Sequence, residues 1–189
     1  DSSTFDILQL SNGAVEERDT TLDSTGLSAS YDTTTQTDGS YVKIVAASDG
    51  SFKNETFDAA AGEDSGTGRQ PDADYAVAWD NKTLANGSSD AAQTLTYDDG
   101  STYSTDKVTQ VDGSSVQTWT RSDGSSGTDT VDASNTLSSH TWTHSDGTSG
   151  TDNYNAATDE SSGSRSYPSG DSSTFDILQL SGGAVEEED

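Results

Sequence analysis

The sequence contains no cysteine and no methionine, only two prolines, and eight lysine and arginine residues against 34 aspartate and glutamate residues. Without cysteine, a disulfide framework and a cysteine-based metal site are both excluded. No run of about 18 or more apolar residues occurs, so we expect no membrane insertion. The formal net charge of −26 repels nucleic acid and anionic lipid, so neither is expected as a partner. A chain without oxidisable sulfur suits a long-lived extracellular protein.

Hydrophobic residues are also scarce, at 28% of the chain against about 45–50% in an average globular domain. Such a chain cannot bury one deep core. It is either a disordered acidic polymer or a thin, repetitive structure in which each layer buries little surface. Three tryptophans, seven tyrosines and four phenylalanines lie mostly in threonine-rich stretches, which favour strands. We therefore expect an ordered structure.

A long repeat is present at the two ends of the sequence. The segment DSSTFDILQLSNGAVEE at residues 1–17 returns as DSSTFDILQLSGGAVEE at residues 171–187, an offset of 170 residues with one difference. We predict a tandem array in which residues 1–170 form one full unit and residues 171–189, equivalent to 1–19, begin the next. The alternative is a self-contained subunit whose twin strands complete a neighbour. The apolar side chains of both copies predict the densest packing of each unit and the contact that sets the register between units: Phe5, Ile7, Leu8, Leu10, Phe175, Ile177, Leu178 and Leu180.

A shorter repeat runs inside this unit. TWTRSDGSSGTD at residues 118–129 recurs as TWTHSDGTSGTD at 141–152, which gives a 23-residue sub-repeat over 118–163. Asp-Gly and Asn-Gly pairs are strong hairpin signals because both turn residues tolerate positive φ. No stretch has the 3.6-residue period of a helix. The pairs lie at 12–13, 38–39, 49–50, 86–87, 99–100, 112–113, 123–124 and 146–147.

These signals predict an all-β fold of repetitive antiparallel strands with Asp-Gly and Asn-Gly turns, stacked into an elongated sheet or solenoid-like filament unit. The alternative is a parallel β-solenoid. In the antiparallel sheet Trp119 and Trp142 form an aromatic ladder on one face, two strands or about 9.5–10 Å apart, whereas a solenoid stacks them at about 4.8 Å. Gln117 and Arg121 share that face with His140 and His144. On a strand the two histidines lie about 13 Å apart, which favours stacking or solvation over zinc binding.

Residues 58–74, DAAAGEDSGTGRQPDAD, interrupt the rhythm and predict an irregular loop. Hard oxygen ligands near this loop and one turn suggest calcium as the one cofactor to consider, against ordinary turn aspartates. No catalytic motif is present, and we expect no enzyme. The aspartates of the calcium hypothesis are Asp72, Asp74, Asp80, Asp98 and Asp99.

Threonine-rich strands punctuated by Asp-Gly, as in LTYDDGSTYSTDKVTQVDGSSVQTWTRSDG, resemble the repeat arrays of giant secreted bacterial surface proteins and adhesins. Tyr97-Asp98-Asp99-Gly100 and Tyr31-Asp32 are distantly similar to the tyrosine-aspartate repeats of Rhs-type proteins. The Gly-Arg that closes such a repeat is missing here. The resemblance implies a surface-exposed stalk, fibre or biofilm matrix component built of β-sheet.

The sequence thus predicts an extracellular structural protein that forms a filament or surface fibre and whose main partner is itself, through adjacent units or subunits. One alternative is a calcium-dependent adhesion module in which residues 58–80 contact surface glycans. The other is the disordered acidic matrix polymer.

Overall fold

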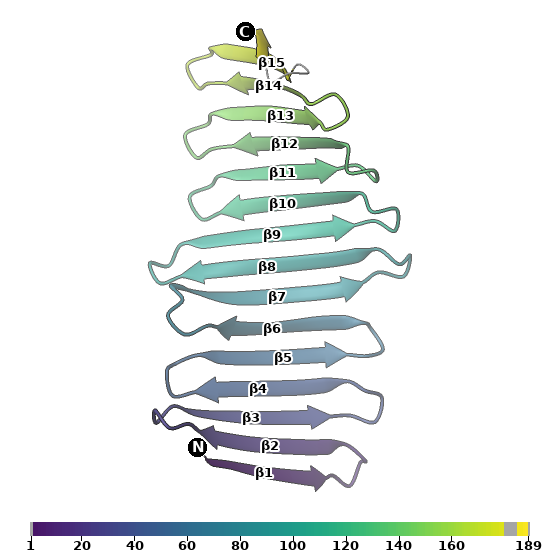
Figure 1. The fold of residues 1–189 in the computed structure, drawn as a ribbon, viewed down its shortest axis with the longest axis vertical. Helices are drawn as coiled ribbons and strands as arrows, with labels where there is room; N and C mark the ends of the chain where they lie inside the picture. The colour runs from purple at the N-terminus through teal and green to yellow at the C-terminus, as the bar shows by residue number, and fades with distance from the viewer. Residues whose placement is uncertain (1, 180–184, 189) are drawn as a thin grey trace. The chain divides into compact units, whose positions relative to one another are not determined.

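The computed structural model of the protein describes residues 2–179 and 185–188. Sixteen strands follow one another in chain order in one open sheet, as Figure 1 shows. Neighbouring strands run antiparallel. The all-β antiparallel prediction is therefore confirmed, and the alternative of a parallel β-solenoid is wrong. Among the described residues there is no helix long and apolar enough to cross a membrane.

Residue contacts divide the chain into two compact units. The first unit comprises Asp1–Thr83 and Ala91–Gly100. Within it each strand from β1 to β7 pairs with the next one along the chain, so the sheet is a simple meander. Its strands are β1 (Ser2–Gln9), β2 (Val15–Leu22), β3 (Ser28–Thr35), β4 (Tyr41–Ala47), β5 (Phe52–Asp58), β6 (Glu63–Arg69), β7 (Tyr75–Thr83) and most of β8 (Ser89–Tyr97).

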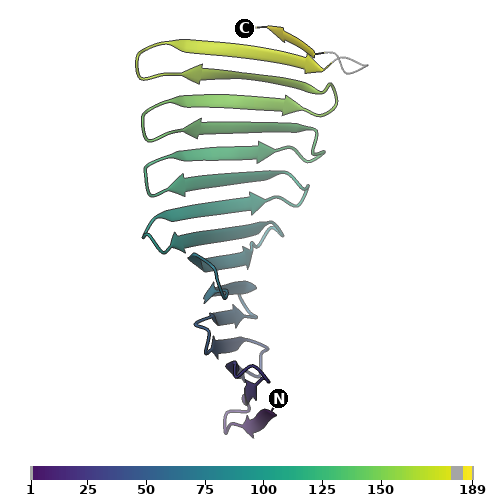
Figure 2. The ribbon, with the colours of Figure 1, turned by 60° about the vertical axis from the view of Figure 1, so that its left-hand side comes forward.

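The second unit comprises Leu84–Asp90 and Ser101–Asp189. Within it each strand from β9 to β16 pairs with the next one along the chain, which again gives a meander. Figure 2 shows its strands from a second side as a single layer, without a helix or second sheet against them. Its strands are β9 (Thr102–Thr109), β10 (Ser115–Arg121), β11 (Ser126–Val131), β12 (Leu137–Thr143), β13 (Ser149–Asn155), β14 (Glu160–Ser166), β15 (Ser172–Gln179) and β16 (Val185–Glu188).

The two copies of the long repeat form the same hairpin. β1 and β15 begin and end at equivalent residues, 170 positions apart. Gln9 lies opposite Val15 in the first hairpin, and Gln179 lies opposite Val185 in the second. The register of strand pairing is therefore identical in the two copies, at every position where both are described.

A single-layer sheet leaves little of the chain buried. Among the described residues only Ala14, Gly68, Ser88 and Ser125 are buried. Such a sheet depends on its backbone ladder and on cross-strand side-chain pairs, each of which contributes about 0.2–1 kcal/mol. The 28% hydrophobic content is sufficient for this architecture because no layer has to fill a core.

The predicted hairpins are confirmed, but their turns differ in type from the prediction. In the first turn the Leu10 N–H donates to the Ala14 carbonyl at 2.8 Å, and the Gly13 N–H donates to the Leu10 carbonyl at 2.9 Å. Gly13 has φ of 85°, whereas Asn12 is not among the residues with positive φ. This is a three-residue loop with glycine in the left-handed position. The residue before the glycine therefore needs no positive φ and can use its side chain otherwise.

The prediction of an irregular loop over residues 58–74 is wrong. Its centre is β6, which pairs with β5 and β7 over its length. Small residues and two glycines at 66 and 68 made the segment resemble a loop. These residues have little side chain of their own, and the ring of Trp79 on the neighbouring strand lies over the two glycines.

Neighbouring turns on one side of the sheet are also joined by hydrogen bonds. In the second unit the Ser122 N–H donates to the Thr102 carbonyl at 3.0 Å, and the Thr102 N–H donates to the Ser122 hydroxyl oxygen at 3.0 Å. The buried Ser88 donates its hydroxyl to the side-chain oxygen of Gln110 at 3.0 Å. Turn-to-turn bonds of this kind satisfy polar groups beyond the ends of the strands.

Candidate functional site

Aromatic rings of this sheet lie over glycines on the adjacent strand. We call these cross-strand contacts aromatic–glycine pairs. A glycine lacks a side chain, so a large ring from the neighbouring strand can lie flat against its backbone and shield the strand. The four pairs are Trp79 with Gly66, Trp119 with Gly127, Trp142 with Gly150, and Phe175 with Gly163.

The two central pairs belong to the 23-residue sub-repeat. Gly127 on β11 lies between Trp119 on β10 and Trp142 on β12. The prediction that the two indoles lie two strands apart is therefore confirmed. A Cβ atom on Gly127 would come within 2.6 Å of the Trp119 ring and 2.5 Å of the Thr141 carbonyl oxygen. No side chain fits there without displacing the indole or the backbone.

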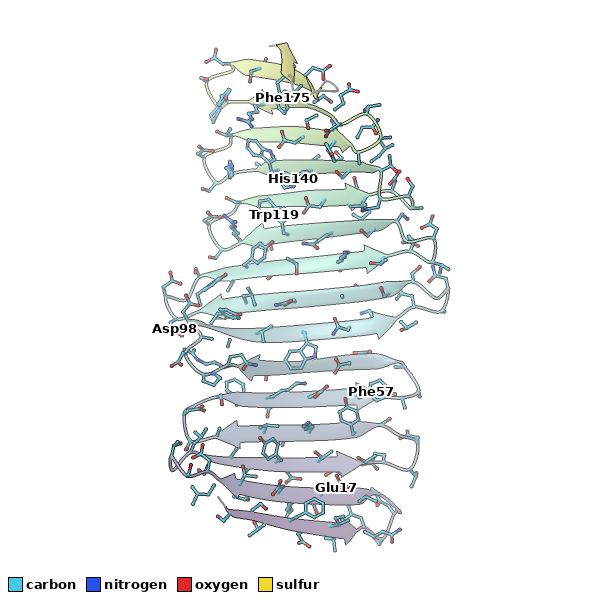
Figure 3. All side chains as sticks on the ribbon, in the orientation of Figure 1. Glu17, Phe57, Asp98, Trp119, His140 and Phe175 are labelled. Carbon is cyan, nitrogen blue, oxygen red and sulfur yellow. The ribbon has the colours of Figure 1, made fainter. Side chains whose placement is uncertain are left out.

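Polar and charged groups surround these rings. His140 stacks on Trp119 with ring centroids 6.1 Å apart and planes 12° apart, and its Nδ1 atom contacts the Asp129 carboxylate. His144 lies 4.6 Å from Trp142, centroid to centroid. The Arg121 guanidinium lies 5.5 Å from the Trp119 ring centroid. His140 is thus stacked on an indole, whereas the His144 ring is tilted by 44° against Trp142. Figure 3 shows Trp119 and His140 on this part of the sheet.

Hydroxyl groups alternate with these rings along the strands. Thr118 faces Thr128 across β10 and β11, and the row continues in register through Thr141 and Thr151. Since adjacent residues of a strand point to opposite faces, this threonine row and the indoles occupy different faces of the second unit. Threonine pairs directly opposite one another stabilise a sheet without a core. The arrangement supports cohesion between strands.

The aspartates of the calcium hypothesis are not brought together as a ligand set. Among the residues that the structure describes, no group of three or more histidine, cysteine, aspartate or glutamate side chains could hold a metal ion. Calcium binding stays a prediction without such a cluster to support it. Asp72 lies in the β6–β7 turn with φ of 60°, Asp74 lies just before β7, Asp80 lies within β7, and Asp98 and Asp99 follow β8.

Asp98 is engaged by an arginine. Its carboxylate accepts hydrogen bonds from Arg69 Nη1 at 2.7 Å and Arg69 Nη2 at 2.9 Å. These bonds lower the pKa of Asp98 and raise the pKa of Arg69. The pair ties the end of β6 to the turn after β8 within the first unit. Figure 3 labels Asp98 in this turn. Two parallel hydrogen bonds between arginine and a carboxylate fix the relative orientation of the two side chains.

The aspartates of the Asp-Gly turns have a second, repeated role. At Asp112 the carboxylate accepts bonds from the Ser114 hydroxyl at 2.7 Å and from the Ser114 N–H at 2.9 Å, and these bonds lower the pKa of Asp112. Asn12 and Asn86 accept the equivalent N–H bonds from Ala14 and Ser88 through their amide oxygens. The carboxylates are thus used to fix the turn, as the turn-aspartate alternative expects. The pKa is lowered in the same way at Asp38, Asp49, Asp123 and Asp146.

The apolar residues of the long repeat differ in exposure between the two copies. In β1, Phe5 is 64%, Ile7 55% and Leu8 53% exposed, so this copy is not densely packed within the described chain, and dense packing between units stays a prediction. In β15 the equivalent Phe175 and Ile177 are half-buried. Leu10 is half-buried, whereas Leu180 and the side chain of Leu178 lie outside the described residues. The predicted contact between units is not tested by these positions alone.

Sequence reasoning missed the glycines of the aromatic–glycine pairs and the partner of Asp98. One signal was present: in both copies of the sub-repeat a glycine follows the tryptophan by eight residues, as in Trp119 and Gly127. Comparison of the sequence with protein-family models and with curated proteins finds no match. The candidate site is therefore defined by its geometry: a single-layer sheet with shielded glycines, fixed turns and one repeated hairpin.

Proposed function

We propose that the chain is a segment of an extracellular structural protein, a filament or surface fibre built by tandem repetition of a β-sheet unit. One observation carries this proposal. The hairpin of β1 and β2 returns 170 residues later as β15 and β16: the first strands have equivalent bounds, and the four residue pairs of the second copy repeat the register of the first. A sequence repeat that is also a repeat of strand pairing permits the sheet to continue from one unit to the next.

The energetics of the sheet agree with a structural role. Strands make contacts with their sequence neighbours, so stability accumulates along the array and requires no larger core as the array grows. Aromatic–glycine pairs and turn aspartates are cohesive elements that recur along the sheet. Sixteen paired strands argue against the disordered polymer, and no observation specifically favours the adhesion module. The resemblance to secreted repeat arrays supports an extracellular location.

Chains with one, two and three tandem copies of the 170-residue unit test the proposal. We expect each added unit to lengthen the particle by the same increment in electron micrographs. Oriented material should give a meridional reflection at about 4.8 Å, the spacing between hydrogen-bonded strands. Separate globules joined like beads, with no common strand direction, would refute a continuous sheet.

A further inference from the structure

The same eight residues, SSTFDILQ, occupy two different environments in this protein. As β15 they pair with β14 on one side and with β16 on the other. As β1 they pair with β2, and no strand among the described residues pairs with their other side. Every residue of β1 is exposed. β15 therefore shows how this sequence is covered when a strand lies on that second side.

Strand β14 supplies two specific contacts to the phenylalanine of the repeat. Gly163 lies opposite Phe175, and a Cβ atom on Gly163 would come within 2.6 Å of that ring. The Arg165 guanidinium lies 5.9 Å from the centroid of the same ring. Phe175 is half-buried as a result, whereas Phe5 is 64% exposed.

The uncovered edge of β1 has few of the features that protect edge strands. Proteins guard such edges with lysine, proline, bulges or short strands. β1 is eight residues long, contains no lysine or proline, and carries one charge, at Asp6. Three of its exposed side chains are large and apolar: Phe5, Ile7 and Leu8. β1 therefore has the properties of an edge strand that can accept a further strand.

The connection that would bring β14 to this edge is also present in the chain. Residues 167–171, Tyr-Pro-Ser-Gly-Asp, link β14 to β15. The Tyr167 N–H donates to the Asp171 carbonyl at 2.9 Å, and the Gly170 N–H donates to the Tyr167 carbonyl at 2.9 Å. Asp171 is the equivalent of Asp1. A preceding copy of the unit would thus reach β1 through this same turn, without any additional linker.

We propose that β1 is the acceptor edge for a strand with the sequence of β14, supplied by a preceding copy of the 170-residue unit in the same polypeptide. The register is that of β14 on β15: the Gly163 equivalent opposite Phe5, the Ser164 equivalent opposite Thr4, and the Arg165 equivalent over the Phe5 ring. This inference rests on the proposed function and specifies its junction: main-chain pairing provides cohesion, and the phenylalanine on glycine fixes the register.

The test keeps the full chain and adds residues 137–170, containing the sequences of β12 to β14, in front of Asp1. Because the chain has no cysteine, a pair of introduced cysteines reports one contact. Directly opposite strand residues have Cα atoms about 4.5–5.5 Å apart, which a disulfide can bridge. Thr4→Cys is combined with Ser164→Cys of the added segment only. Controls place the first cysteine at Ser2 or at Asp6, which report slips of two residues in either direction.

We expect the internal disulfide to form at least tenfold faster with the cysteine at position 4 than with the cysteine at position 2 or 6. Hydrogen exchange at the β1 amides that point away from β2 should be at least tenfold slower than in the chain without the added segment. Faster linkage from Ser2 or Asp6, with slowed exchange, overturns the register and leaves the proposed function standing. Unchanged hydrogen exchange in β1 overturns both the pairing of β14 with β1 and the proposed function. Disulfide-linked dimers in place of the internal link overturn a preceding copy as the occupant.

A second pair of variants tests the role of glycine. Gly163→Val in the added segment should lower the rate of the Thr4 disulfide about tenfold, since a side chain there displaces the Phe5 ring and also meets the Thr151 carbonyl oxygen, 2.5 Å from the added Cβ atom. Repeating it with Phe5→Ala should recover part of the rate, and this recovery isolates the contribution of the ring. Ser161→Val in the same segment is the matched control, because it adds a β-branched side chain to the same strand opposite Ile7 and should leave the rate within about twofold. Equal rates for the two variants would overturn the seating of Phe5 on glycine.

Discussion

The aromatic–glycine pair of Trp142 and Gly150 gives a quantitative prediction about stability. A Cβ atom on Gly150 would lie 2.6 Å from the Trp142 ring and 2.7 Å from the Ser164 carbonyl oxygen. Gly150→Ala gains about 0.5–1 kcal/mol because alanine loses less backbone entropy on folding. Overpacking costs about 1–3 kcal/mol. We therefore expect a net loss of about 1–2 kcal/mol in the free energy of unfolding.

Urea denaturation followed by circular dichroism measures this loss. With an m-value of about 2 kcal/mol/M, the midpoint should fall by about 0.5–1 M. Gly68→Ala is the matched control: it is also a strand glycine, but its Cβ atom would lie 3.6 Å from the nearest ring and 3.2 Å from the Phe52 carbonyl. We expect a smaller loss or none there.

The ring's part in the effect is isolated by repeating Gly150→Ala in a chain with Trp142→Ala. Removing the indole should relieve about 0.5–1 kcal/mol of the loss, within the range found for residues in contact. The contact with the Ser164 carbonyl accounts for the remainder. If Gly150→Ala is neutral, or costs the same with and without the indole, the ring does not require a glycine beneath it.

Three further predictions concern charge and assembly. The hydrogen bonds from Ser114 lower the pKa of Asp112 in the folded state. The contribution of this carboxylate to stability is therefore present above the unfolded pKa and is lost as the pH falls through the folded pKa. Asp112→Asn should keep the melting temperature at neutral pH and reduce its fall between about pH 5 and 2; an unchanged fall contradicts this. Raising NaCl from about 0.1 to 1 M shortens the Debye length from about 10 to 3 Å. Because the net charge is −26, this screening of repulsion between negative charges should raise the melting temperature. Calcium chloride at matched ionic strength should give no further rise, and a further rise would support a calcium site at the predicted aspartates. Deleting residues 171–189 leaves β14 without its partner β15, and β1 already has an unpaired edge. The shortened chain should therefore form open-ended head-to-tail oligomers in sedimentation experiments, whereas a stable monomer would contradict the pairing of β14 with β1.

The sequence predicted those parts of the fold that depend on local signals. Glycine after Asp or Asn located the turns, and the 23-residue offset placed Trp119 and Trp142 on one face two strands apart. The type of turn could not be derived in this way. In the structure only the glycine of the turn at Asp112 has positive φ, which leaves the Asp112 carboxylate to accept a hydrogen bond from Ser114.

Features that depend on a partner from another strand escaped prediction. β6 resembled a loop because the ring that shields Gly66 belongs to Trp79, thirteen residues later. Phe5 and Ile7 predicted dense packing because they are apolar, yet their packing depends on which strand lies beside them. The pairing of Arg69 with Asp98 spans 29 residues and has no local signature.

Contacts restricted to neighbouring strands have a consequence for how such a protein evolves. A hairpin of the 118–163 region comprises two strands, so duplicating or losing one 23-residue stretch restores both the chain direction and the facing of every later side chain. Recombination between these near-identical stretches would change the protein's length in discrete steps without disturbing what lies on either side. Natural variants of this chain should therefore differ by multiples of one hairpin.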